Sequence, residues 1–321
     1  MNVRDLADAA IEIPIVTSFT KIGYHARRRL DDWTPLTDYD FGGRVVVLTG
    51  ATSGLGRCAA QLFTEQGATL VVVGRSADRN QGVVDEIVAS SGNTAVSQIA
   101  CDTGEYDQVR HLADQVLTDH DRLDVLIHNA GALTAERHDS SDGTEQTIAS
   151  QVVGPFLLTT LLLDRLAETE GSRVITMSSG GMYTAGLTVD QLQMPADDYK
   201  GTEQYARAKR AQVTLNEMWA ERSGHRGVSF QAMHPGWADT PGVEAALPGF
   251  RKVMGPLLRD ADQGADTLVW LAGDAAPLDH NGGFWLDRRL RSIHKLPTTK
   301  KTDTPERRER LWSWVTERAG L

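Results

Sequence analysis

The sequence has few cysteines and no long apolar run. Its two cysteines, Cys58 and Cys101, lie near neither a second cysteine pair nor a histidine cluster. This argues against a disulfide framework and a structural metal, and we predict no bound metal. A run of about 18 apolar residues, as a membrane-spanning helix needs, is absent, and the acidic, proline-interrupted residues 1–20 do not resemble a cleaved signal. The sequence therefore predicts a cytoplasmic protein.

Basic charge is also scarce. The chain has 33 Lys and Arg against 43 Asp and Glu, which gives a formal net charge of -10. Its basic clusters, at 27–29 and 288–291, are short, so we expect no nucleic-acid partner. The remaining composition, 40% hydrophobic and 24% charged, is typical of a globular protein with a substantial core. It leaves the oligomeric state open, and a homodimer is one state that it allows.

Short β-branched runs alternate with helical segments from residue 44 onward. Continuous apolar strands separated by helices indicate a parallel sheet buried on both faces, and right-handed crossovers then give an α/β, Rossmann-type doubly wound sheet. We expect a helical extension at 1–40 and a single sheet domain at 41–321 that ends in a helix opened by Thr304. Gly67 and Ser76 are expected to end the first helix and to cap the second. The predicted strands span 44–49, 69–74, 94–100, 123–128, 173–178 and 228–233.

Two longer segments follow strand ends, at about 179–202 and at 237–260, and the second contains three prolines and is expected to be irregular. Substrates usually bind where such excursions leave a parallel sheet. The apolar side chains on them favour an apolar small-molecule substrate. These side chains are Met182, Trp237, Leu247, Phe250 and Met254.

An apolar stripe recurs at helical spacing within the extension. It consists of Ile15, Val16, Phe19, Ile22, Ala26 and Leu30 and runs up to the basic cluster at 27–29, with Leu30 directly after it. Stripes of this kind are usually core-facing, so we expect the extension to pack against the main body. The same pattern would also suit a helix on a membrane surface, which is the less favoured alternative.

The stretch VVVLTGATSGLGR combines a predicted strand, a glycine-rich loop and the start of a helix. Glycines at these points allow a tight turn and close approach of the backbone to a pyrophosphate, and the helix N-terminus attracts its charge. A purely structural glycine turn is the alternative. The predicted phosphate loop consists of Gly50, Thr52, Ser53, Gly54, Leu55 and Gly56.

The end of the second predicted strand, Gly74-Arg75-Ser76, bears on the choice of nucleotide. An NAD site needs a carboxylate there for the ribose hydroxyls, whereas a guanidinium suits a 2′-phosphate. Arg75 therefore favours NADP(H) over NAD(H), although a solvated charge at a helix start is the alternative. Asp102, after the third strand, is placed to hydrogen-bond the adenine, or else it caps the next helix.

These motifs resemble, in order, those of the short-chain dehydrogenase/reductase family, from about residue 43 to about residue 290. The resemblance is carried by TGATSGLG, by CD at 101–102, HNAG at 128–131 and SS at 178–179, and by YARAK at 205–209 and HPGWADT at 234–240. It implies an oxidoreductase on a Rossmann-type fold.

The resemblance also implies a role for YARAK, whose Tyr and Lys would otherwise be one solvated helix face. Tyr205 would donate a proton to a carbonyl in reduction, although the reference phenol pKa of about 10 is too high for efficient exchange near neutrality. Lys209 would stabilise the phenolate and hold the nicotinamide ribose. Ser179 would hydrogen-bond the substrate oxygen, and turn capping is its alternative. Ser178 should point elsewhere.

Further cofactor contacts follow from the resemblance alone. Asn129 would support the fourth strand, with Ala130 and Gly131 under the cofactor. His128 stands where the family more usually has Asn, and we interpret it as a hydrogen-bonding residue at the strand end. The segment expected to close over the nicotinamide contributes Pro235, Gly236 and Thr240, with Thr240 facing the carboxamide.

One position departs from the family pattern. The family usually has an Asn three residues before a glycine on the central helix, where it steadies a water that relays protons to the lysine. Here Gln151 stands before Gly154, which puts the relay in doubt. We predict that Gln151 partly replaces the asparagine, and we include it in the catalytic set with Ser179, Tyr205 and Lys209. The alternative is that it only packs against a neighbouring helix.

Together these features predict an NADP(H)-dependent oxidoreductase acting on a carbonyl or secondary alcohol. The rival hypothesis is a non-catalytic regulator that senses the NADP(H) ratio. Such proteins typically lose the Tyr or the Lys of the motif, and this chain keeps both.

Overall fold

The computed structural model describes residues 3–321 and confirms the predicted fold class. One sheet has the strand order β3-β2-β1-β4-β5-β6-β7-β8. Neighbours from β3 to β7 are parallel, and β8 pairs antiparallel with β7. Each predicted run contains one strand, and the two short final strands were not predicted. The strands are β1 (Val45–Thr49), β2 (Thr69–Gly74), β3 (Val96–Ala100), β4 (Val125–His128), β5 (Arg173–Met177), β6 (Ser229–Met233), β7 (Phe284–Leu286) and β8 (Arg289–Leu290).

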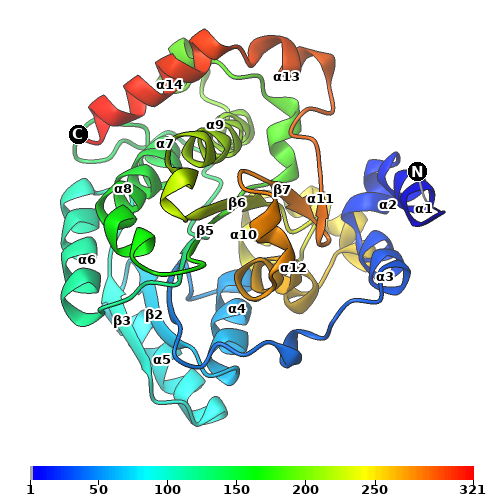
Figure 1. The fold of residues 1–321 in the computed structure, drawn as a ribbon. Coiled ribbons are helices and arrows are strands. Elements are labelled where there is room, and N and C mark those ends of the chain that lie inside the picture. Colours follow the sequence, from blue (N-terminus) through cyan, green and yellow to red (C-terminus); the bar gives the residue numbers. More distant parts are fainter. Residues whose placement is uncertain (1–2) are drawn as a thin grey trace.

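Helices cover both faces of the sheet (Figure 1). Because successive side chains of a strand point to opposite faces, β1 divides its residues between two cores. Val45 and Val47 pack with α6, α8 and α9, whereas Val46 and Leu48 pack with α4, α5 and α12. The helices of the two layers are α4 (Gly54–Glu65), α5 (Ala77–Ser91), α6 (Tyr106–Asp119), α8 (Gly154–Ala167), α9 (Gly201–Ser223) and α12 (Ala261–Gly273). The short α7 (Gln146–Ile148) precedes α8, and α13 (Pro297–Thr302) and α14 (Pro305–Arg318) close the chain.

The predicted helix caps and the predicted helix end at Gly67 are confirmed. The Ser76 side chain accepts a hydrogen bond from the Arg79 N–H, and Thr304 does the same for the Arg307 N–H. Gly67 follows α4 with a φ of +86°, a conformation that suits glycine.

The second predicted substrate loop is not irregular. It contains α10 (Pro241–Ala246) and α11 (Pro248–Met254), each of which begins with a proline. A proline at the first helical position costs no hydrogen bond and fixes a helical φ, so these prolines start helices here. The first substrate loop contains 3₁₀ turns, of which η3 (Gly180–Thr184) directly follows Ser179.

The extension packs against the main body as expected, but its apolar stripe contributes to this only in part. Phe19 is 3% exposed, but Ile15, Val16 and Ile22 are 46–51% exposed. The stripe does not lie on one helix, because Pro14 and Thr20 divide the extension into α1 (Val3–Glu12), α2 (Ile15–Phe19) and α3 (Lys21–Leu30). The boundary at residue 40 stays a prediction.

Buried charges, rather than the stripe, attach the extension to the body. Arg27 of α3 is fully buried and reaches Asp8 of α1 at 2.8 Å and Asp287 at 2.7 Å. Asp287 also receives Arg259 at 2.6 Å, and both side chains of that pair are 1% exposed. Asp287 and Arg288 lie in the turn between β7 and β8 with φ of +53° and +56°, which is strained for residues other than glycine.

One stretch, Gln146–Ala167, is long and apolar enough to cross a membrane, with a mean hydropathy of 1.4 over an 18-residue window. It includes α8, and 67% of that window is buried. The apolar residues of α8 face the sheet and α6, as those of a core helix do.

Candidate active site

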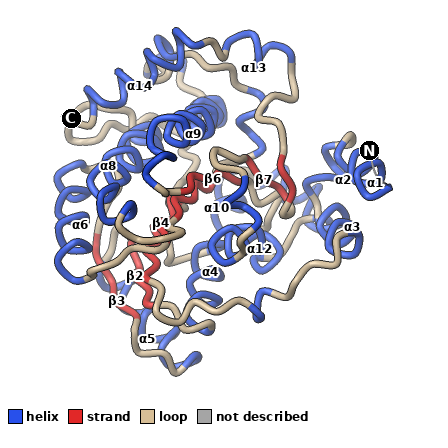
Figure 2. Tube along the Cα trace, viewed as in Figure 1, coloured by secondary structure: helices blue, strands red, loops and turns tan. Residues whose placement is uncertain are grey.

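The predicted site residues meet at one edge of the sheet. Parallel strands end on the same side, and ligands of doubly wound folds bind beyond those ends. Figure 2 shows the loops that leave this edge. The residues that follow the strands are Gly50 after β1, Arg75 after β2, Asp102 after β3, Asn129 after β4, Ser179 after β5 and Pro235 after β6.

The loop between β1 and α4 has the form of a pyrophosphate cradle. Gly50 and Gly54 have φ of +70° and +54°, and a Cβ on Gly56 would lie 2.2 Å from the Gly50 carbonyl oxygen. Ser53 is the N-cap of α4 but makes no side-chain capping hydrogen bond within the described chain. The first-turn N–H groups therefore remain available to an external anion. These residues fit a dinucleotide pyrophosphate.

The side chains of two other residues in the predicted phosphate loop point toward neighbouring elements. The Thr52 methyl group lies next to the end of β2, since a Cβ on Gly74 would be 3.2 Å from it. Leu55 packs away from the loop against α12, where a Cβ on Gly264 would be 2.5 Å from its Cδ2. Leu55 is therefore placed to contribute through its backbone.

The polar side chains that follow β2 and β3 differ in exposure and in their hydrogen bonds. Arg75 is exposed, so its guanidinium is accessible to a ligand. Asp102 is partly buried, and its Oδ1 accepts a hydrogen bond from the Gly104 N–H at 2.9 Å. It closes a turn and does not cap α6, whose N-cap is Glu105.

Asn129 joins the end of β4 to the phosphate loop. Its Nδ2 donates to the carbonyls of Thr49 and Gly50, both at 3.0 Å. The Ala130 backbone lies against Gly50, where a Cβ would be 2.7 Å from the Ala130 Cα. His128 turns inward, with its Nε2 2.8 Å from Thr159 Oγ1, and burial lowers the pKa of His128 to about 3.

Ser179, Tyr205 and Lys209 converge from β5 and α9. Ser179 and Tyr205 are partly exposed, whereas Lys209 is 2% exposed. The Lys209 Nζ lies 5.2 Å from the Tyr205 ring centroid and donates to the Met177 carbonyl at 2.9 Å. The Ser179 Oγ accepts from the Gly181 N–H at 3.2 Å. Ser178 points elsewhere, as predicted, because its buried Oγ donates to the Lys209 carbonyl.

Burial opposes the charged form of both groups of the Tyr–Lys pair. It lowers the pKa of Lys209 from 10.5 to about 7. It also raises the pKa of Tyr205 to about 12, with the hydrogen bond to Ser179 acting in the opposite direction. Burial thus favours the neutral form of each group, an amine at Lys209 and a phenol at Tyr205.

Gln151 lies in the π-helical turn η2 (Ala149–Val153), which precedes α8. Its Nε2 donates to the Ala132 carbonyl at 2.7 Å, while its buried Oε1 has no hydrogen-bond partner within residues 3–321. A Cβ on Gly131 would lie 3.0 Å from that oxygen and 3.5 Å from Lys209 Nζ. Gln151 Oε1 and Lys209 Nζ therefore border the same spot under Gly131.

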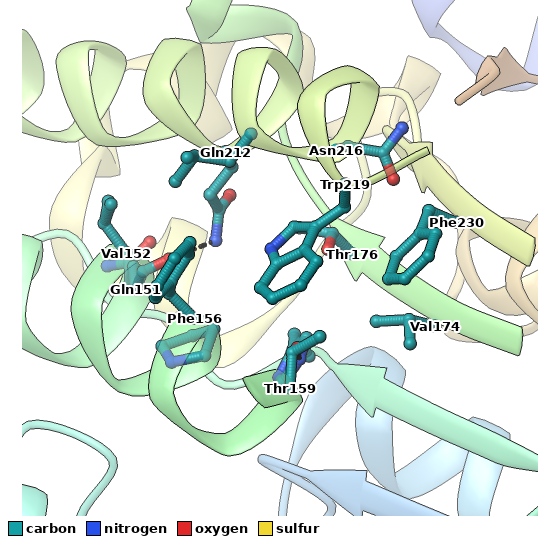
Figure 3. Close-up of a pocket in the computed structure, with 13 residues that line it drawn as sticks. Gln151, Val152, Phe156, Thr159, Val174, Thr176, Gln212, Asn216, Trp219 and Phe230 are labelled. Carbon is teal, nitrogen blue, oxygen red and sulfur yellow. Dashed lines mark hydrogen bonds between the residues drawn. The ribbon is translucent and has the colours of Figure 1, made fainter. Parts of the chain in front are cut away.

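Figure 3 shows how Gln151 is held. Gln212 reaches from α9, and its Nε2 donates to the Gln151 carbonyl at 2.7 Å. A cavity of about 30 Å³ adjoins this pair between α8, α9 and the sheet, with room for about one or two waters. The π turn was not predicted; π turns often occur at functional sites.

The loop after β6 lies next to the phosphate loop. Gly236 has a φ of +73°, and Pro235 accepts a hydrogen bond through its carbonyl from Arg259 at 3.2 Å. Thr240 caps α10 by accepting from the Val243 N–H. Its side chain approaches the phosphate loop, since a Cβ on Gly54 would be 3.5 Å from it.

Sequence reasoning misplaced one side chain and missed two. Met182 was expected to border the substrate, but it is fully buried. Phe19 and Arg259 were not expected at the site, yet both contact the 235–237 loop. Their sequence surroundings carry no motif that could have identified them.

Comparisons with known proteins identify a family that the chain matches. A family model described as short chain dehydrogenase matches residues 44–248. The chain is 38% identical over 295 residues to dehydrogenase/reductase SDR family member 12 of Homo sapiens, with 91% of each chain covered. It is 30% identical over 290 residues to retinol dehydrogenase 12 of Bos taurus, with 89% of each covered.

A solved structure shares the fold. It is that of a short chain dehydrogenase from Escherichia coli CFT073 complexed with NADPH, with a TM-score of 0.63 and 22% identity. The similarity covers 79% of this chain and 100% of that one.

Proposed function

This chain belongs to the short-chain dehydrogenase/reductase family, and from that premise we propose an NADP(H)-dependent oxidoreductase that acts on apolar carbonyls or secondary alcohols. Members of the family are oxidoreductases that bind NAD(P)(H). When bound, the nicotinamide supplies or accepts the hydride. The residues of this chain hold the cofactor, orient the substrate and move the proton.

The observation that carries the proposal is the buried Lys209 beside the accessible Tyr205. No carboxylate among residues 3–321 forms a salt bridge with Lys209, and its Nζ donates to a backbone carbonyl. Burying an unpaired cation is expensive and gives no packing benefit that an apolar side chain would not supply. The arrangement is useful if the ammonium stabilises a phenolate at Tyr205.

The proton transfer then has three participants. In reduction, the Tyr205 hydroxyl donates its proton to the substrate oxygen, and Ser179 donates a hydrogen bond to the same oxygen as charge develops there. Lys209 stabilises the tyrosinate that is left. In oxidation the same groups act in reverse.

Gln151 is proposed to position a water for Lys209. Its unpartnered Oε1 is an acceptor that borders the same spot as Lys209 Nζ. A water that donates to this oxygen could accept from the ammonium and so connect it to solvent. Gln151 acts through the water and the lysine and is therefore a positioning residue.

The preference for NADP(H) rests on Arg75. Its exposed guanidinium follows β2, where the 2′-phosphate of NADP(H) would lie. A charge-assisted hydrogen bond of this kind contributes about 1.5 to 3 kcal/mol, roughly ten- to a hundredfold in affinity. We also propose a cytoplasmic location, since Cys58 and Cys101 are both free thiols.

Titration with NADPH and NADH tests the cofactor assignment. We expect NADPH to bind more tightly than NADH. In Arg75→Ala, the ratio of the two affinities should fall about tenfold or more. Arg226→Ala is the control, because Arg226 precedes β6 at the opposite edge of the sheet. Equal affinities in the unmodified protein would contradict the assignment. NADPH binding without turnover on a panel of ketones and aldehydes would favour the rival, a non-catalytic sensor.

A further inference from the structure

We propose that the N-terminal extension is a working part of the active site and that Phe19 is the positioning residue through which it acts. Phe19 ends α2 and lies between the segment that follows β5 and the segment that follows β6. The first segment carries Ser179, and the second carries Pro235 and Gly236. The inference rests on the proposed function, because it concerns the nicotinamide end of the same site.

The Phe19 ring packs against the segment next to Ser179. A Cβ on Gly180 would lie 2.6 Å from Phe19 Cε2, so a residue with a side chain at position 180 would displace the ring or the turn. The Tyr183 ring of the same turn is stacked at 6.5 Å between centroids. With 3% of its surface exposed, Phe19 acts as a wedge behind η3 and does not line an open pocket.

The same ring holds the segment that follows β6. The His234 and Trp237 rings meet it edge-on, with centroids 4.5 Å and 5.7 Å away. His234 is 1% exposed, and burial together with the nearby Arg259 holds the pKa of His234 well below its usual value. The imidazole is therefore neutral and packs as an aromatic side chain.

The Phe19 backbone holds this segment directly. Its carbonyl accepts hydrogen bonds from the Trp237 N–H at 2.7 Å and from Arg259 Nε at 3.1 Å. A Cβ on Gly236 would lie 2.6 Å from this carbonyl oxygen. Glycine at 236 thus serves two needs, the left-handed φ and the close approach of the extension.

Buried charges fix the position of Phe19. The carbonyl of the preceding Ser18 accepts from Arg27 and from Arg259, both at 3.0 Å. These two guanidiniums share the Asp287 carboxylate, and Arg259 also donates to the Pro235 carbonyl. The end of α2, the turn after β7 and the loop after β6 are therefore joined by one network of buried hydrogen bonds and ion pairs.

From these contacts we expect Phe19 to affect binding of one end of the cofactor and not the other. An extension that only stabilised the fold would affect both ends of the cofactor alike. Phe19 contacts the two segments expected at the nicotinamide end, whereas the phosphate loop and Arg75 hold the adenosine end. Loss of its ring should therefore weaken NADPH binding and leave binding of adenosine 2′,5′-bisphosphate, the adenosine part alone, unchanged.

The test compares Phe19→Ala, Phe19→Leu and the control Ile22→Ala in the full chain. Ile22 is on α3 and is 47% exposed. For Phe19→Ala we expect a roughly tenfold or greater loss of NADPH affinity, equal to about 1.4 kcal/mol, and unchanged affinity for adenosine 2′,5′-bisphosphate. On an accepted carbonyl, kcat should fall more than KM rises. Phe19→Leu should recover part of each loss, because it restores apolar volume, and Ile22→Ala should match the unmodified protein.

Amide hydrogen exchange gives a second measurement that needs no ligand. In Phe19→Ala, exchange should rise in peptides that cover 179–184 and 234–240 and should stay the same in β1 to β3. Equal losses for both ligands, or exchange that rises evenly over the chain, would overturn the inference. Failure of the unmodified protein to bind NADPH would instead refute the proposed function.

Discussion

The cofactor side of the sheet and the side that holds the extension are stabilised in opposite ways. Around β1 and β2 the core is apolar, and Val46, Leu48 and Val72 are fully buried against α4, α5 and α12. Between the extension and the turn after β7 the interior also holds buried charges, with Arg27 and Arg259 sharing Asp287. Burial could thus be predicted from a continuous apolar strand but not from a basic cluster. Arg27 of the basic cluster 27–29 is fully buried, while Arg28 and Arg29 are exposed.

The two kinds of interior also differ in their energetics. In an apolar core each buried group adds its own contribution to stability, so truncating one side chain leaves the contacts of its neighbours in place. A buried ion pair contributes little net stability, but loss of one partner leaves an uncompensated charge. The ionic side should therefore be the more sensitive of the two to a single change.

The largest expected effect is that of Asp287→Ala. The substitution leaves two buried guanidiniums without their shared carboxylate, and we expect the free energy of unfolding to fall by about 3 to 5 kcal/mol. Urea denaturation measures it. Asp164→Ala is the matched control, because Asp164 pairs with Arg226 at 2.6 Å while 87% exposed, and it should cost less than about 1 kcal/mol. Similar losses in both variants would contradict the claim that burial makes the Asp287 network sensitive to loss of one partner.

A second prediction concerns Lys209, a buried amine that has no carboxylate partner within the described residues. Its pKa in the folded protein, about 7, lies below the ordinary 10.5. Between these values the unfolded chain binds the proton and the folded one does not. The free energy of unfolding of the cofactor-free protein should therefore rise with pH across this window, by at most about 1.4 kcal/mol per pH unit.

Lys209→Met should lack this contribution. Subtracting the stability–pH curve of the variant from that of the unmodified protein isolates it, because the other groups titrate in both. We also expect the Met variant to lose NADPH affinity, since the ribose contact is gone. A flat difference curve between pH 7 and pH 10 would show that Lys209 keeps its proton in the folded protein.

The smallest of these effects concerns Gln151. We expect Gln151→Leu to slow single-turnover NADPH oxidation about tenfold, because the water acceptor is lost, while Gln151→Asn keeps or exceeds the original rate. NADPH affinity should be unchanged in both variants. A Leu variant with the original rate would leave Gln151 as a packing residue.

The parts of the fold that could be predicted are those determined by short, local sequence patterns. The strands from β1 to β6 were predicted from continuous apolar runs, and Ser76 and Thr304 from capping chemistry. In contrast, β7 and β8 were missed, because three and two residues are too short for a pattern. The helices α10 and α11 were missed, because proline was taken as a breaker and not as a first helical residue.

For the site, too, the residues in local motifs could be predicted and those placed by long-range contacts could not. The phosphate loop and the Tyr205–Lys209 spacing were apparent from motifs, and the structure places these residues at one edge of the sheet. The contacts of Phe19 join residues more than 160 positions apart, and no local pattern encodes such a pairing. The exposed Ile15, Val16 and Ile22 show that helical spacing alone did not identify which residue of the stripe would be buried.

The most direct test of the account is single-turnover NADPH oxidation by Tyr205→Phe with an accepted carbonyl, measured beside the unmodified protein. The substitution removes the transferable proton and leaves the ring in place. We expect NADPH affinity close to the original and a rate lower by about a hundredfold or more, since general acid catalysis contributes roughly that much. A rate equal to that of the unmodified protein would contradict the assignment of Tyr205 as the proton donor.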